Sequence, residues 1–158
     1  MFTGKGIKLY TELQKEIASS DEIRLMVSFI KKRGLVLLLP QLKDFTNRGG
    51  ILKVITTTYM KATDFDAIKQ LSKLKNTEIK ITYNETSERL HAKAYIFLRN
   101  TGFHTAYIGS SNISQQALDS GAEWNIKVTQ IEQPKIFKTI TNAFEAAEDG
   151  VRDSELNI

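Results

Sequence analysis

The chain has 158 residues, of which 41% are hydrophobic and 25% are charged, and its formal net charge is +4. This length and composition are typical of one soluble domain that buries its own core, and no apolar run is long enough for a transmembrane helix. The absence of cysteine excludes disulfides and thiolate metal sites. Together with an N-terminus that has no signal-peptide pattern, it favours a cytoplasmic setting. The positive charge favours an anionic partner, with nucleic acid as the first candidate.

Helical and strand patterns alternate through the first half of the chain. Apolar residues three and four apart predict helices, and polar–apolar alternation predicts strands. In order, we expect a helix over 8–20, a strand over 22–29, a helix over 34–47 that kinks or starts near Pro40, a strand over 51–56, a helix over 65–74 with Asp64 as its N-cap, and a strand over 78–83. This alternation implies parallel strands with helices on the sheet faces.

The pattern changes in the second half, where strands follow one another. We expect strands over 91–98 and 105–109 joined as an antiparallel hairpin, a short helix over 114–118 ended by Gly121, a strand over 123–128, and a final helix from Pro134 to Ala147 with Ile136, Ile140 and Phe144 inward. The strand over 91–98 is apolar on both faces, which predicts a central position. The predicted fold class is α/β, a mixed and mainly parallel sheet sandwiched by helices, in one domain over 1–148 with a polar tail or linker over 149–158.

Polar residues that suit phosphate chemistry lie at the ends of the last three strands. His91 and Lys93 are two apart, so their side chains project from the same side of a strand. The next strand runs into Gly109-Ser110-Ser111-Asn112, where glycine allows close backbone approach and the polar side chains can donate to phosphate oxygens.

Glu123 begins the last predicted strand and faces away from Trp124, Ile126 and Val128, whose periodicity predicts core positions. Its carboxylate is then available to accept a hydrogen bond from one ring nitrogen of His91. That bond would fix the tautomer of the imidazole and make the other nitrogen a better nucleophile.

His91-Ala92-Lys93, the Gly109–Asn112 turn and Glu123 together resemble the HKD motif of the phospholipase D superfamily, in its one-motif nuclease branch. MVSFIKKRGL, GGILKVITTTYM, LHAKAYIF and TAYIGSSNIS resemble the phospholipase D-like domain at the N-terminus of some bacterial superfamily II helicases, and the motif is similar to that of metal-independent restriction endonucleases. The resemblance covers roughly 22–128. It departs at Leu98, where the superfamily has an aspartate; the restriction-like branch also lacks that aspartate and relies on the later glutamate.

The resemblance implies a phospholipase D-like fold and a two-step hydrolysis of a phosphodiester through a covalent phosphohistidine. It assigns His91 as nucleophile, Lys93 and Asn112 as holders of the non-bridging oxygens, Ser110 or Ser111 as a further hydrogen-bond donor, and Glu123 as the group that orients His91. It also implies that no metal or other cofactor is required. One-motif members obtain the general acid by pairing two subunits, which implies a homodimer with the active site at its twofold interface.

Three functions follow for the chain. The first is a DNA nuclease, expected to be joined to a helicase or restriction specificity domain. The second is a phosphodiesterase for lipid headgroups, against which the sequence has no amphipathic membrane-binding stretch. The third is a catalytically weak or inactive DNA-binding dimerisation module, which the leucine at position 98 favours.

Three further polar stretches have a structural and a functional interpretation. His104 is expected to be a solvated loop residue, with substrate contact as the alternative. The basic triplet Lys31-Lys32-Arg33 is expected to be a solvated turn, with phosphate contact as the alternative. The run over 56–59 is either a capped strand end or a ligand contact, because ligands often bind beyond the carboxyl ends of parallel strands.

Overall fold

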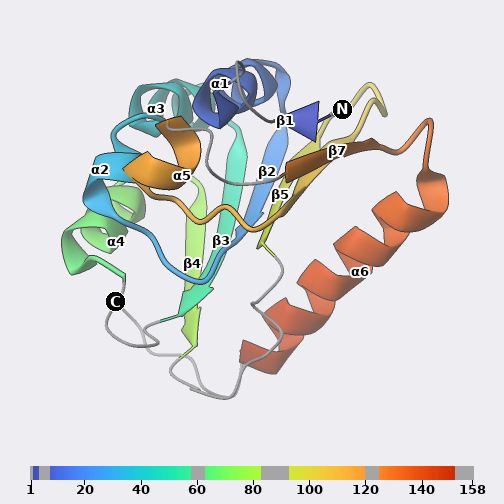
Figure 1. The fold of residues 1–158 in the computed structure, drawn as a ribbon. Coiled ribbons are helices and arrows are strands. Elements are labelled where there is room, and N and C mark those ends of the chain that lie inside the picture. The colour runs from blue at the N-terminus through green and yellow to red at the C-terminus, as the bar shows by residue number, and fades with distance from the viewer. Residues whose placement is uncertain (1, 4–7, 58–62, 83–92, 120–124, 152–158) are drawn as a thin grey trace.

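The computed structural model describes residues 2–3, 8–57, 63–82, 93–119 and 125–151 (Figure 1). The elements are β1 (Phe2–Thr3), α1 (Leu9–Ser19), β2 (Glu22–Met26), α2 (Lys32–Leu35), α3 (Leu39–Asn47), β3 (Ile51–Thr57), α4 (Phe65–Ser72), β4 (Thr77–Thr82), β5 (Lys93–Leu98), β6 (Thr105–Gly109), α5 (Gln115–Asp119), β7 (Asn125–Thr129) and α6 (Pro134–Val151). The predicted helices and strands are all present, with ends that differ by a few residues.

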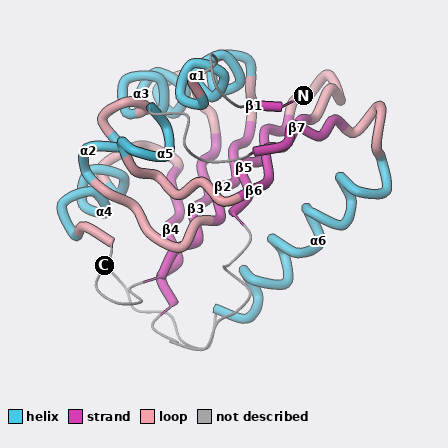
Figure 2. Tube along the Cα trace, in the orientation of Figure 1, coloured by secondary structure: helices cyan, strands magenta, loops and turns pink. Residues whose placement is uncertain are grey.

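The described strands form one seven-stranded sheet in the order β1-β7-β6-β5-β2-β3-β4 (Figure 2). Strands β2, β3 and β4 are parallel, whereas β5 runs antiparallel to β2, and β6, β7 and β1 continue antiparallel. The sheet is mixed, as predicted, but its antiparallel pairs outnumber its parallel ones, so the prediction of mainly parallel pairing was wrong. The reason is that β5 enters beside β2 in the opposite direction and a short hairpin then turns the chain into β6.

Helices cover both faces of the sheet. Among the described helices, α1 to α5 lie on one face, and α6 lies by itself across the other (Figure 1). The core under α1–α5 includes Leu13, Phe45 and Tyr95, and the smaller core under α6 includes Ile96 and Phe144. The predicted sandwich of a sheet between helices is therefore confirmed.

Strand β5 occupies the fourth position among the seven strands. Tyr95 and Phe97 pack in the core under α1–α5, and Ala94 and Ile96 pack in the core under α6. The predicted central strand with two buried faces is confirmed. Lys93 is two residues before Tyr95 on the strand, so its side chain projects from the same face of the sheet, the one under α1–α5.

Two predicted core positions are exposed. Ile136 has 46% of its surface exposed, because Phe137, Ile140 and Phe144 form the stripe of α6 that packs on the sheet. Ile126 is 51% exposed, since the single helix on its face covers Val128 but not the region beyond it. Trp124 lies outside the described residues.

Pro40 separates two helices rather than kinking one. It lies in the first turn of α3, where its missing N–H costs nothing, and α2 has already ended at Leu35. Gly49 ends α3 with a φ of +97°, and the Gly50 N–H donates to the carbonyl of Phe45. At the other end of the chain, α6 continues to Val151 and includes the first three residues of the predicted tail.

Candidate functional site

Three of the predicted polar segments meet at one end of the sheet. Lys93 at the start of β5 pairs with Gly109 at the end of β6, and Gly109 pairs with Asn125 at the start of β7. Ala94 pairs with Met26, so the carboxyl end of β2 lies at the same end of the sheet. We call this end the catalytic end, because Lys93, Ser110 and Asn112, which were predicted as catalytic residues, belong to it. His91 and Glu123 lie outside the described residues.

Asn112 joins the turn after β6 to the segment after β2. Its side-chain Oδ1 accepts hydrogen bonds from the backbone N–H groups of Ser28, at 2.7 Å, and Phe29, at 3.1 Å. Because the carbonyl oxygen is used in this way, the amide group has one orientation, in which Nδ2 points away from that backbone. The residue is 8% exposed and is therefore held in a fixed position.

The two serines of the turn differ in exposure. Ser110 is exposed, whereas Ser111 is fully buried, and its hydroxyl accepts a hydrogen bond of 2.6 Å from Asn125 Nδ2. The Ser111 carbonyl also accepts a hydrogen bond of 2.9 Å from the hydroxyl of Tyr95. A buried hydroxyl that is already hydrogen-bonded does not suit a phosphate at the surface, so Ser110 fits the predicted phosphate contact and Ser111 supports the turn.

Tyr95 and Asn125 are supporting residues that the sequence analysis did not identify. Burial raises the pKa of the Tyr95 hydroxyl, which keeps it protonated as a donor. Tyr95 is two residues beyond Lys93, and Asn125 is two residues beyond Glu123 in the sequence. That spacing was a usable signal, since residues two apart on a strand share a face.

The segment after β2 is fixed between the Gly109–Asn112 turn and α4. The Lys31 N–H donates to the Ile113 carbonyl at 2.7 Å, and the Lys32 N–H donates to Asp64 Oδ2 at 2.8 Å. Asp64 occupies the N-cap position of α4, as predicted, but its side chain makes no capping hydrogen bond to that helix. Its carboxylate instead caps the first residue of α2.

His104 lies at the opposite end of the sheet. It precedes β6, whereas Ser110 follows it, and the strand between them is roughly 14 Å long. Its Nδ1 accepts a hydrogen bond from the Arg99 N–H at 3.0 Å, and its ring stacks on Phe137. Burial and the charge of Arg99 lower the pKa of His104. It is a packed residue rather than the predicted solvated one, and it is remote from the catalytic end.

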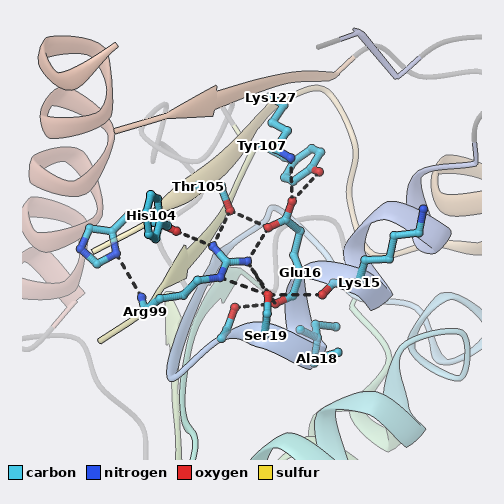
Figure 3. Close-up of polar contacts among 12 residues, drawn as sticks. Lys15, Glu16, Ala18, Ser19, Arg99, His104, Thr105, Tyr107 and Lys127 are labelled. Atoms are coloured by element: carbon cyan, nitrogen blue, oxygen red, sulfur yellow. Dashed lines mark hydrogen bonds and ion pairs between the residues drawn. The ribbon is translucent and has the colours of Figure 1, made fainter. Parts of the chain in front are cut away.

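A buried carboxylate on α1 joins that helix to side chains of the sheet (Figure 3). Glu16 of α1 contacts Arg99 at 2.6 Å and Lys127 at 3.1 Å, and it accepts hydrogen bonds from Thr105 and Tyr107. Burial alone would raise the pKa of Glu16, but the hydrogen bonds of these four partners outweigh it and the pKa is lowered. The cluster fastens α1 to β6, to β7 and to Arg99, the residue that follows β5.

A cavity of about 540 Å³ also lies at the end of the sheet opposite the catalytic end, lined in part by Arg48, Ile51 and Arg99. The guanidinium of Arg48 donates to the carbonyls of Ile17, Ala18 and Ser20. That of Arg99 is bound to Glu16 and Ser19. Both cations have protein partners, so this cavity does not have the chemistry of a phosphate site.

Leu98, which replaces the superfamily aspartate, also lies at that opposite end. It is five residues beyond Lys93 on β5 and pairs with Glu22, roughly 17 Å along the strand. A carboxylate at this position would not reach the catalytic end. The leucine therefore removes no group from the candidate site. Of the run over 56–59, Thr56 is fully buried and residues 58 and 59 lie outside the described part.

A family model described as "Cardiolipin synthase, PLD-like domain" matches residues 13–147. The chain thus belongs to the phospholipase D-like family, as its motif predicted, and phosphodiesterase is the class of enzyme that this membership supports. No curated protein sequence matches the chain significantly.

Solved structures have the same fold at low identity. NucT from Helicobacter pylori is similar over 94% of this chain and 89% of its own, with a TM-score of 0.65 and 16% identity. Polyphosphate kinase from Porphyromonas gingivalis is similar over 86% of this chain and 20% of its own, with a TM-score of 0.60 and 16% identity. TrmBL2, an archaeal chromatin protein, is similar over 87% of this chain and 48% of its own, with a TM-score of 0.51 and 13% identity. None of the described helices is long and apolar enough to cross a membrane.

Proposed function

We propose that the chain is a metal-independent nuclease that hydrolyses DNA through a covalent phosphohistidine at His91. The observation that supports this most is the convergence of Lys93, Ser110 and the oriented amide of Asn112 at one end of the sheet. The positive net charge suits a nucleic acid. A DNA-binding protein, the archaeal chromatin protein TrmBL2, contains the same fold.

In the first step, a ring nitrogen of His91 attacks phosphorus and the bond to the leaving oxygen breaks. Negative charge on the non-bridging oxygens is stabilised by Lys93, by Asn112 Nδ2 and by the Ser110 hydroxyl. Glu123 accepts a hydrogen bond from the other ring nitrogen and orients the imidazole. In the second step, water attacks the phosphohistidine, the nitrogen–phosphorus bond breaks, and a phosphate monoester leaves.

The leaving oxygen needs a proton, and the chain has only one other histidine. His104 is too remote to provide it, since it lies at the far end of β6. We therefore propose that His91 of a second copy is the general acid, so that a homodimer shares one site at its twofold axis. The same imidazole then removes a proton from the attacking water in the second step.

The test of catalysis is cleavage of a plasmid and of an oligonucleotide in excess chelator. The native chain is expected to cut, His91→Ala is expected to be inactive, and the matched control His104→Asn is expected to remain active. Cleavage that persists in His91→Ala, or that requires an added divalent cation, would contradict the proposal.

The shared site predicts a distinct result when native and His91→Ala chains are mixed and allowed to exchange. Activity should fall with the square of the native fraction, because only a dimer with two histidines has both nucleophile and acid. A linear decrease would instead mean that each chain works alone.

A non-catalytic DNA-binding dimerisation module is the remaining alternative. Its main support in the sequence, the leucine at position 98, is weakened by the distance of that residue from Lys93. A salt-dependent affinity for DNA that His91→Ala leaves unchanged, without cleavage by the native chain, would favour this alternative. For the full-length protein we propose a cytoplasmic enzyme in which this domain is joined to a helicase or a specificity domain.

A further inference from the structure

The basic triplet Lys31-Lys32-Arg33 lies beside the Gly109–Asn112 turn, although nothing in the proposed chemistry uses it. Its backbone follows directly on the Ser28 and Phe29 N–H groups bound by Asn112, and the Lys31 N–H donates to Ile113.

Directly after the triplet, the backbone at Gly34 contacts Ser114, two residues beyond the Gly109–Asn112 turn. A Cβ added at Gly34 would lie 2.4 Å from Ser114 Cα, so the backbones of the two segments touch there. Contact on both sides of the triplet places its backbone next to the turn that carries Ser110 and Asn112, which are proposed to hold the scissile phosphate.

The other side of the triplet is fixed to α4. The Lys32 N–H donates to Asp64, and the Ile30 N–H donates to Thr63 Oγ1 at 3.3 Å. The Asp64 N–H returns a hydrogen bond to the Ile30 carbonyl at 2.9 Å. The backbone that presents the cations is therefore held from two directions, and little ordering of it is needed when a ligand binds.

The charges of the triplet are unequally compensated. Lys31 Nζ lies 3.9 Å from Asp64 Oδ1, so part of its charge is offset. Lys32 and Arg33 are exposed, and no acidic side chain of the described residues forms an ion pair with either. By contrast, Arg99 and Lys127 are both bound to Glu16.

We propose that Lys32 and Arg33 form a subsite for a phosphate of the DNA backbone next to the scissile one. This inference rests on the proposed function, and it specifies that function further. A diester with a single phosphate has no group for this subsite, whereas a nucleic-acid strand places a phosphate on either side of the one being cut. Because the subsite contacts a phosphate and not a base edge, it should increase the affinity for DNA irrespective of the DNA sequence.

The test compares three proteins, each in a His91→Ala background so that DNA is not cut: the unaltered triplet, Lys32→Ala/Arg33→Ala, and Lys135→Ala/Lys138→Ala. The last removes the same two charges from exposed positions on α6. Affinity for a fluorescein-labelled oligonucleotide, single-stranded and duplex, is measured by anisotropy over a range of salt concentrations.

Losing the contact with one phosphate should reduce the slope of log K against log salt by about 0.7 on a single strand and about 0.9 on a duplex. The α6 control should keep its slope. Equal slopes for all three proteins would overturn the subsite. Charge reversal, Lys32→Glu/Arg33→Glu, should weaken binding further, and circular dichroism of each variant checks its fold.

The same substitutions in the native background separate the two proposals. The Lys32→Ala/Arg33→Ala enzyme should show a raised KM for the oligonucleotide, in parallel with its lost affinity. If the native enzyme cuts no DNA, the nuclease proposal fails, whereas the salt slopes still decide whether these residues bind the backbone.

Discussion

Asn112 Oδ1 lies 2.7 Å from the backbone nitrogen of Ser28, and this contact joins segments that are 84 residues apart. The oxygen holds the segment after β2, and in the proposed mechanism the nitrogen of the same amide donates to a phosphate oxygen. The stability of the site and its proposed chemistry therefore depend on different atoms of the same side chain.

Substitutions of Asn112 should separate these functions. Asn112→Asp keeps an acceptor for Ser28 and Phe29 but replaces the donor by a negative charge, so we expect a stably folded protein with cleavage reduced by about 100-fold or more. Asn112→Ala removes the acceptor as well, and we expect a further loss of about 1–3 kcal/mol in the free energy of unfolding. Urea denaturation and single-turnover cleavage measure the two effects. Equal stability of the two variants would contradict this assignment.

Glu16 should contribute much more to stability than an exposed carboxylate does. Glu16→Ala leaves Arg99 and Lys127 without their buried partner, and we expect a loss of about 3–5 kcal/mol in the free energy of unfolding. The matched control is Glu145→Ala, since Glu145 is 58% exposed and lies 3.6 Å from Arg24. That variant should lose less than about 1 kcal/mol in the same urea titration. Similar losses of stability in Glu16→Ala and Glu145→Ala would mean that the Glu16 cluster stabilises the fold no more than an exposed ion pair does.

Stability should decrease in acid because two groups have lowered pKa values in the folded chain. His104 resists protonation when folded, so the free energy of unfolding should fall as the pH drops below the ordinary histidine pKa of 6.5. The stabilisation from Glu16 is complete above its ordinary pKa of 4.5 and is lost as the pH falls through the lower folded pKa. Urea titrations between neutral and acid pH measure the curve. In Glu16→Gln the more acidic part of the decrease should be smaller.

Gly34 should tolerate no side chain, because a Cβ there would lie 2.4 Å from the Ser114 backbone. We expect Gly34→Ala to cost about 1–3 kcal/mol in the free energy of unfolding and to displace the basic triplet. Weaker DNA binding should accompany the lost stability. Val36→Ala, at a half-exposed position two residues further on, is the control and should change neither property. A fully stable Gly34→Ala protein would refute the close contact.

Local patterns in the sequence were sufficient for most of the fold. The apolar residues on both faces of 91–98 predicted a central strand with two buried faces. Pro40 predicted either a kink or the start of a helix, and the structure has the start. The prediction of mainly parallel strands failed because periodicity does not give strand direction, which depends on where β5 inserts. Of the residues predicted to face inward on α6, Ile140 and Phe144 are buried, and Ile136 is exposed in favour of its apolar neighbour Phe137. Only packing on the sheet selects between two adjacent apolar residues.

The candidate site was predicted in part. Lys93 and the Gly109–Asn112 turn converge as the motif implied, and Ser110 is the exposed serine. No local pattern could show that Asn112 binds the backbone at Ser28, or that the carboxylate of Asp64 binds the Lys32 N–H of α2. Both contacts join segments distant in sequence. They depend on how the loops fold over the end of the sheet.

The most direct test of the account is to quench a reaction of the native chain with an oligonucleotide, in excess chelator and without acid, and to digest it for mass spectrometry. We predict a peptide that carries a nucleotidyl phosphate on His91, absent from His91→Ala and present in His104→Asn. Cleavage of the oligonucleotide by the native chain with no adduct, together with unimpaired cleavage by His91→Ala, would contradict the account.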